Sequence, residues 1–157
     1  MYAMARIVVT TFGSTGDLNP FIALGLALRS NGHDVFFAVE ANFQQQVSLL
    51  GFPARLLTGD QTEAPDPYSH QIFNSDQPLT SLKLLVNRYI LPTLPAKVAE
   101  LREICQQADL LITVASQFAA SIVAVMLQIP WISVILTPST LPSARVAVQP
   151  MRVPLVN

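Results

Sequence analysis

Residues 6–39 read RIVVTTFGSTGDLNPFIALGLALRSNGHDVFFAV and predict a strand, a helix and a second strand. The six residues after Arg6 are all β-branched or aromatic, which is typical of a strand buried on both faces of a parallel sheet. The turn GSTGD follows, and we expect Asn19 to cap a helix that has Pro20 at its first position and stops at Gly32. The stretch therefore predicts a βαβ unit with a glycine-rich turn after its first strand.

The same alternation continues along the chain. Further strands are expected over residues 34–39, 54–57, 109–114 and 131–136, with helices over 42–50 and 117–128. A helical stretch over 79–108 contains Pro92 and Pro95, which must kink or split it. The pattern predicts an α/β fold, an open, doubly wound, Rossmann-like parallel sheet. Its ligand edge would gather residues 13–17, Glu40, 115–117 and 137–139 at the carboxyl ends of the strands.

Composition excludes several classes of protein. The 157 residues fit one domain, 51% of them are hydrophobic and only 12% are charged. A net charge of −1 gives no electrostatic footprint for nucleic acid. Residues 110–144 carry no charge, but polar residues and Pro130 divide them before about 20 apolar residues accumulate, so we expect buried core and no stable membrane insertion. Such a stretch needs cover, from this domain's helices or from a partner surface.

Cysteine and histidine usage gives no sign of a metal or a cofactor. The single cysteine, Cys105, cannot form an internal disulfide, which favours a buried structural thiol and a cytoplasmic protein. His33 and His70 have no companion ligand at metal spacing, so packing or solvated histidines are the better interpretation. We expect no metal site.

The GSTGD turn is the best candidate for chemistry. Gly13 and Gly16 allow a tight turn, and amides at the start of the following helix can face a phosphate or an oxyanion. If Asn19 is the cap, Asp17 is not needed for capping and can project into the cleft as a carboxylate base. The alternatives are an ordinary chain reversal, and an Asp17 that only complements the helix dipole.

Residues 12–52 resemble the opening of glycosyltransferases of the sterol glucosyltransferase and glycopeptide or macrolide type. These are UDP-glycosyltransferase-like enzymes of the GT-B fold, with a family 28 N-terminal domain. The family pattern is followed at Gly13, Gly16, Asp17, Pro20, Ala23, Leu24, Gly25, Leu28, Gly32, His33 and Val35. Residues 109–138 are similar to a later block of the family, with Gln128 where glycine is frequent. The resemblance covers residues 6–138.

This resemblance implies that residues 1–157 are a single, incomplete acceptor-binding domain, without the C-terminal domain that holds the nucleotide-sugar. The implied reaction is inverting transfer of a hexose, from a donor of the UDP-glucose type to a hydroxyl of an apolar acceptor such as a sterol, lipid or polyketide. By motif position Asp17 is the base, and Gly13, Ser14, Thr15 and Gly16 lie near the diphosphate and the transferred sugar. The chain alone is then expected to be inactive.

The acceptor side is expected to include the polar, proline-containing loop of residues 58–78 and the kinked helix after it. Tyr68, His70 and Phe73 in that loop, together with Gln117 at the ligand edge, are the candidate acceptor-binding residues. Aromatic side chains at such positions are more often part of a core, so that interpretation stays open for Tyr68 and Phe73.

Two other functions are compatible with the predicted fold. A nicotinamide-dinucleotide domain would use Glu40, at the end of the second strand, to bind a ribose hydroxyl. Its G-x-G-x-x-G fingerprint, however, would require glycine at Thr15 and Leu18. A non-catalytic ligand-binding module would keep the cleft and give Asp17 no chemical role.

Overall fold

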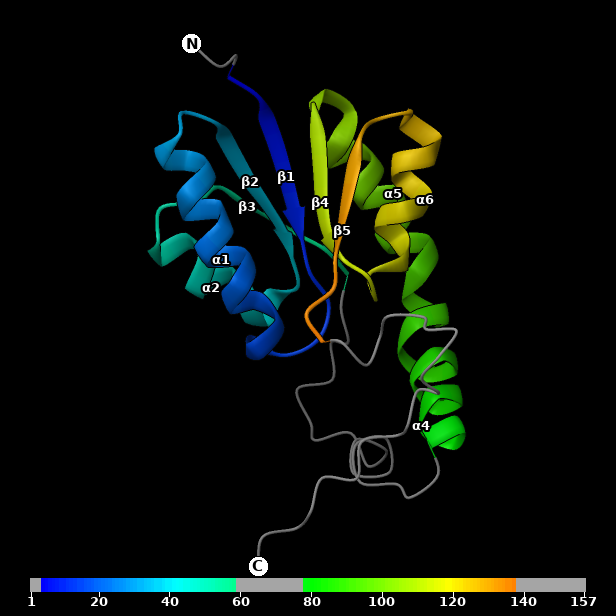
Figure 1. Cartoon of the computed structure of the whole chain (residues 1–157). Helices are drawn as coiled ribbons and strands as arrows, with labels where there is room; N and C mark the ends of the chain where they lie inside the picture. Colours follow the sequence, from blue (N-terminus) through cyan, green and yellow to red (C-terminus); the bar gives the residue numbers. More distant parts are fainter. Residues whose placement is uncertain (1–3, 59–77, 138–157) are drawn as a thin grey trace, which may run out of the picture.

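The computed structural model describes residues 4–58 and 78–137, which form one parallel sheet covered by helices (Figure 1). In the order β3-β2-β1-β4-β5 every neighbouring pair of strands is parallel. The strands are β1 (Arg6–Thr10), β2 (Asp34–Val39), β3 (Ala54–Leu56), β4 (Leu110–Val114) and β5 (Trp131–Val134). The predicted α/β fold is confirmed, and four of the five strands are one or two residues shorter than expected.

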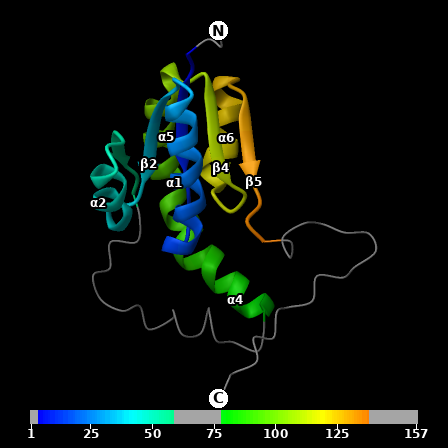
Figure 2. The ribbon, with the colours of Figure 1, turned by 60° about the vertical axis from the view of Figure 1, so that its left-hand side comes forward.

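Helices cover both faces of the sheet. Helices α1 (Thr15–Ser30) and α2 (Ala41–Leu49) lie on one face, and α5 (Leu91–Ile104) and α6 (Phe118–Leu127) lie on the other (Figure 2). Alternate residues of a strand point to opposite faces, so β1 sends Ile7 and Val9 into one buried cluster and Val8 into the other. The sheet is therefore doubly wound, with one apolar core on each side.

Helix α1 begins earlier in the chain than expected. Its first residue is Thr15 and its N-cap is Ser14, so the prediction that Asn19 caps the helix and that Pro20 opens it was wrong. The Ser14-x-x-Asp17 spacing forms a capping box, in which the Asp17 carboxylate accepts the Ser14 N–H, and this starts the helix about one turn before Asn19. Pro20 is tolerated inside the helix near its start.

Close contact between α1 and the sheet depends on Gly25. A Cβ at this position would lie 3.0 Å from two ring atoms of Phe37 and 3.3 Å from the ring of Phe52. Both rings are buried, and their centroids lie 4.9 Å apart. Gly25 thus lets the backbone of α1 lie close to a pair of aromatic rings, one of them on β2.

The long helix predicted over residues 79–108 is split, as its prolines require. It consists of α4 (Pro78–Leu85), a π-helical segment (Val86–Ile90), α5, and a 3₁₀ turn (Cys105–Gln107). Pro92 and Pro95 have no N–H for the i→i−4 bond, and the widened π-helical turn is closed instead by the Leu91 N–H on the Val86 carbonyl. The hydroxyl of Thr93 donates to the Tyr89 carbonyl at 2.7 Å. As a result α4 turns away from the axis of α5 (Figure 2).

The uncharged stretch from residue 110 is only partly buried among the described residues. Four of the five residues of β4 are buried, as expected. The expectation of a buried core was wrong for β5 and for the outer surface of α6, because β5 is the last strand of the described sheet and α6 is covered on one side only. The exposed apolar residues there are Phe118, Ile122, Val125, Met126, Trp131, Ile132 and Ile135. In the described part of the chain, every helix is too short or too polar to cross a bilayer.

Cys105 lies inside the core between α5, α6 and the sheet. It is fully buried, and this burial raises the pKa of its thiol to about 12, because a thiolate would be poorly solvated there. The interpretation of Cys105 as a structural thiol is confirmed.

Gln128 gives a direct test of how α6 ends. It adopts the left-handed conformation, with φ of +54°, at the position where the resemblance described above leads us to expect glycine. This conformation costs a non-glycine residue roughly 1–2 kcal/mol. Glycine avoids that cost, but it loses more backbone entropy on folding, and this loss offsets part of the gain in stability. We expect Gln128→Gly to raise the free energy of unfolding by about 0.5–1 kcal/mol in urea titrations.

The matched control is Gln45→Gly, at an exposed position inside α2. Here glycine should lower the free energy of unfolding by about 1 kcal/mol. A loss of stability for both variants would contradict the assignment of Gln128 as a strained helix terminus.

Candidate active site

The GSTGD turn lies at the carboxyl end of β1, where the strand order reverses between β2 and β4. Sheets of this type bind ligands at that switch point. Gly13 has φ of +126°, and a Cβ on it would overlap with the carboxylate of Asp17. Glycine is therefore required here both by the backbone conformation and by the space that Asp17 occupies.

Asp17 is at the third position of α1 and is half-buried. Its Oδ2 atom accepts two hydrogen bonds, from the Ser14 backbone N–H at 2.7 Å and from the Ser14 hydroxyl at 2.9 Å. The expectation that Asp17 takes no part in capping was wrong, because the helix starts at Thr15. Both bonds end on the same oxygen, and within the described residues Oδ1 accepts none. These two bonds hold the carboxylate in one orientation.

The rest of the turn presents polar groups to solvent. Ser14, Thr15 and Gly16 are exposed. The N–H groups of Thr15 and Gly16 are in the first turn of α1, where no intrahelical carbonyl can accept them. With the positive end of the helix dipole, such groups favour a bound anion. The turn thus combines an oriented carboxylate with an anion-binding helix terminus.

Gln117 lies at the expected edge of the sheet, but its side chain is turned inward. The residue is 4% exposed, and its Nε2 donates to the Thr11 carbonyl at 3.1 Å. This bond joins the start of α6 to the residue two places before the Gly13 turn. A direct contact of Gln117 with an acceptor stays a prediction, and its visible role is to fix the end of β1.

The other three predicted acceptor-binding residues lie outside the described residues. Tyr68, His70 and Phe73 belong to the stretch 59–77, and their role stays a prediction. Thr58, which precedes this stretch, is bound to α5. Its backbone N–H and its hydroxyl donate to the two oxygens of Glu100 at 2.6 and 2.5 Å.

Sequence reasoning missed Lys97. This α5 residue is 4% exposed, and its ammonium contacts the Glu40 carboxylate at 2.5 Å. Glu40 was expected to face ligand, as a ribose-binding acid in the nicotinamide alternative, but it is engaged by Lys97. A lysine within a mixed apolar and polar helix normally indicates a solvated face. The sequence carried no signal that this one is buried, because its partner is 57 residues away. His33, by contrast, packs as expected, with its Nδ1 accepting the Ala5 N–H at 3.3 Å.

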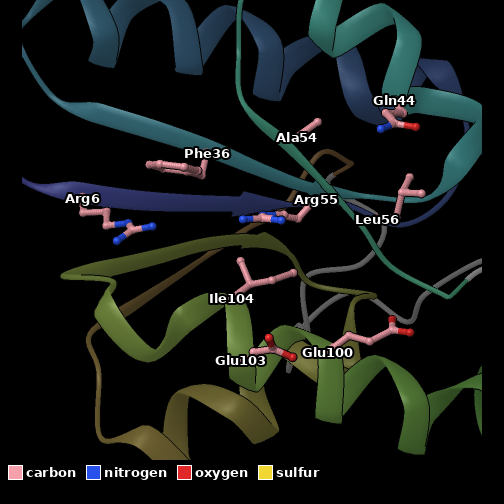
Figure 3. Close-up of a pocket in the computed structure, with 9 residues that line it drawn as sticks. All are labelled: Arg6, Phe36, Gln44, Ala54, Arg55, Leu56, Glu100, Glu103 and Ile104. Carbon is pink, nitrogen blue, oxygen red and sulfur yellow. The ribbon is translucent and has the colours of Figure 1, made fainter.

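A cavity of about 510 Å³ lies elsewhere, between α5 and the β2–β3 side of the sheet (Figure 3). Arg6 and Arg55 reach it from the strands, and Glu100 and Glu103 reach it from α5. The guanidinium of Arg6 stacks on Phe36 at 4.5 Å from the ring centroid. None of the predicted site residues lines this cavity, so it is separate from the GSTGD turn.

Several solved structures with this architecture are glycosyltransferases. The chain superimposes on the spinosyn rhamnosyltransferase SpnG with a TM-score of 0.67 at 15% identity, covering 86% of this chain and 36% of that one. It superimposes on the calicheamicin glycosyltransferase CalG4 with a TM-score of 0.63 at 18% identity, covering 85% and 33%. The fold therefore defines a Rossmann-like domain of the GT-B class.

Sequence comparison gives the family. The chain belongs to the glycosyltransferase family 28 N-terminal domain, whose profile matches residues 7–145. A sterol 3-beta-glucosyltransferase of Candida albicans is 28% identical over 135 residues, which are 86% of this chain and 9% of the fungal protein. The O-mycaminosyltylonolide 6-deoxyallosyltransferase of Streptomyces fradiae is 40% identical over 55 residues, 35% of this chain and 13% of that protein. The chain thus spans about a tenth of the length of these curated relatives.

Proposed function

We propose that this domain binds the acceptor in an inverting glycosyltransferase, and that Asp17 is the general base. The observation that carries the proposal is the Asp17 carboxylate at the switch point of a family 28 domain, oriented through Oδ2 and with no hydrogen bond on Oδ1 from residues 4–58 and 78–137. A base needs a fixed position and an oxygen that is free to take a proton. A carboxylate that only capped the helix would not need an oxygen that is free to take a proton.

In the proposed reaction, Asp17 removes the proton from an acceptor hydroxyl while the hydroxyl oxygen attacks the anomeric carbon of the donor sugar. A new carbon–oxygen bond forms on one face of the sugar, and the bond to the nucleoside diphosphate breaks on the other. The configuration at the anomeric carbon is therefore inverted. The proton stays on Asp17 until solvent removes it, and the diphosphate leaves with the electron pair of the broken bond.

The exposed turn would assist the leaving group and the transferred sugar. The N–H groups of Thr15 and Gly16 and the hydroxyl of Ser14 are donors next to Asp17, and the start of α1 favours negative charge. Gly13 and Gly16 have no side chain that would keep a ligand from the backbone. A separate domain would hold the nucleotide part of the donor, which we take to be of the UDP-glucose type.

The proposed acceptor is an apolar molecule with a hydroxyl group, such as a sterol, lipid or polyketide. The arm formed by α4 and the π-helical segment continues from α5 beyond the carboxyl ends of the strands, which is the end of the sheet where the turn lies (Figure 1). Its half-buried residues include Leu84, Leu85 and Val86, which give it an apolar surface. Relatives include a sterol 3-beta-glucosyltransferase and an O-mycaminosyltylonolide 6-deoxyallosyltransferase, whose names point to acceptors of this kind.

The division of labour can be tested with the chain alone. Incubated with a panel of nucleotide-sugars and with sterol, lipid and polyketide acceptors, it should form no glycoside detectable by mass spectrometry. A protein that joins this domain to a nucleotide-sugar-binding domain should form the glycoside from the same mixture. Efficient transfer by the chain alone would contradict the proposal, because all donor contacts would then have to come from this domain.

Binding measurements on the same chain separate the remaining functions. We expect saturable binding of an apolar hydroxylated acceptor and no binding of NADH in calorimetric titrations. Binding of NADH at micromolar concentration would instead support a dinucleotide-binding domain.

A further inference from the structure

The ion pair of Lys97, which is buried, and Glu40, which is partly exposed, lies at the edge of the sheet that carries the proposed active site. Lys97 belongs to α5, on the face opposite α1, and its side chain is 5% exposed. Its ammonium is 2.5 Å from Oε1 of Glu40 and 5.0 Å from the centroid of the Phe12 ring. A buried ammonium is tolerated when a carboxylate and an aromatic face replace its water. The Lys97 ammonium thus connects α5 to residues just after the ends of β1 and β2.

The register of β1 and β2 shows that the residues following the two strands lie side by side. Thr10 of β1 pairs with Ala38 of β2, and continuing two residues along each chain brings Phe12 level with Glu40. Phe12 is followed directly by Gly13, and Glu40 is the N-cap of α2. Lys97 therefore acts on the last residue before the GSTGD turn.

A second contact holds the neighbouring residue. The buried amide of Gln117, at the start of α6, donates to the Thr11 carbonyl. Thr11 is thus held from the α5–α6 face, and Phe12 contacts Lys97 from that face while it also packs against the buried cluster on the α1 face, to which the turn crosses. Gly13 allows this crossing, but a glycine with φ of +126° and no side chain adds no rigidity at its own position. The rigidity must come from the residues on either side of it.

We propose that Lys97 is a positioning residue, which through Phe12 and Glu40 fixes the GSTGD turn and so the direction of the Asp17 carboxylate. The inference rests on the proposed function of Asp17. An ion pair that served stability alone could be replaced by uncharged residues of similar size at little cost. Such replacements often leave the free energy of unfolding nearly unchanged, whether the pair is exposed or buried. A positioning pair could not, because the uncharged side chains would no longer hold Phe12 in one place.

The test uses the double variant Lys97→Met/Glu40→Gln, which removes both charges and keeps the length of both side chains. The matched control is Arg102→Met/Glu103→Gln, which removes the same two charges from exposed residues of α5. Two properties are measured for each. The first is the kcat and KM of transfer in a protein that joins this domain to a nucleotide-sugar-binding domain. The second is hydrogen exchange at the amides of Ser14, Asp17 and Leu18 in this chain.

The expected result for the double variant is a kcat lower by roughly 10- to 100-fold, since small displacements of a catalytic group cost this much. The KM for the nucleotide-sugar should be unchanged, and the three amides should exchange faster, because their bonds within the Ser14–Asp17 capping box would open more often. Lys97→Arg should retain most of the activity, because a guanidinium can keep both the carboxylate and the ring contact. The control variant should match the unaltered protein in both measurements.

Unchanged kcat and exchange in a folded double variant would overturn the inference. So would a fall in kcat without faster exchange, since Lys97 would then act by another route, and so would an equal effect of the control variant. The failure of the proposed function has a different signature. Asp17→Asn could retain full turnover while the Lys97 variant still exchanges the three amides faster. In that case Asp17 is not the base, but Lys97 still fixes the position of the turn.

Discussion

Replacing Asp17 with asparagine should lower turnover by roughly 10²–10⁴-fold, the usual contribution of a positioned base, in a protein that joins this domain to a nucleotide-sugar-binding domain. Asparagine has the same shape as aspartate, and its Oδ1 can still accept the two hydrogen bonds from Ser14. The capping contacts and the position of the turn should therefore survive. What the variant loses is the oxygen that takes the proton. Affinity for the acceptor should hardly change, so the effect should lie in kcat and not in KM.

Stability measured on the same variant separates catalysis from capping. If Asp17 served only the helix terminus, Asp17→Asn would lower the free energy of unfolding by at most about 1 kcal/mol and leave turnover at saturating substrate intact. Asp17→Ala is the companion variant. It removes the capping acceptor as well and should cost a further 0.5–2 kcal/mol or so. Near-normal turnover of the asparagine variant would remove Asp17 from the mechanism, whatever its stability.

Gly13→Ala should be nearly as damaging, for a geometric reason. The backbone at residue 13 has φ of +126°, which an L-residue adopts only with strain of about 1–3 kcal/mol. The added Cβ would also overlap with the Asp17 carboxylate, so either the turn or the carboxylate has to move. We expect turnover to fall by roughly 10²-fold or more, as for other misplaced catalytic groups. Steady-state kinetics in the protein with both domains would measure this.

Gly32→Ala provides the matched control. Gly32 lies in the connection between α1 and β2 and has φ of +86°, so alanine is strained there too. A Cβ on Gly32, however, would meet no atom within 4 Å. Thermal unfolding should show a loss of stability for both variants, and only Gly13→Ala should lose turnover. A similar loss of turnover in the two variants would mean that the damage comes from general destabilisation and not from the contact with Asp17.

Local sequence signals were sufficient for the architecture. The uninterrupted apolar strands predicted a parallel sheet, and the alternation with helices predicted that it is doubly wound. The prolines in residues 79–108 predicted the break that separates α4 from α5. Each of these signals depends on neighbouring residues along the chain, so it can be recognised without knowing the fold. The resemblance to the glycosyltransferases likewise rested on contiguous motifs, and the family profile confirms it.

Competition between two local signals was harder to resolve. Asn19-Pro20 and Ser14-x-x-Asp17 are both acceptable helix starts, and the structure uses the second. The choice matters for the site, because it makes Asp17 part of the cap while leaving one of its oxygens open. The exposure of β5 and of the outer face of α6 could not be predicted from the sequence either, because an uncharged strand has the same sequence pattern whether or not a neighbour covers it.

The sequence by itself determined the order of the elements, the glycine turn at the switch point and the carboxylate that follows it. Only the tertiary structure decided which distant residues meet at that turn. The bond from Gln117 to Thr11 and the pair of Lys97 with Glu40 join positions 106 and 57 residues apart. Lys97 is buried because α5 packs beside the exits of β1 and β2, and such a contact leaves no periodic trace in the sequence. The chemistry of a turn is local, whereas the contacts of Thr11 and Phe12 just before it come from helices that are distant in the sequence.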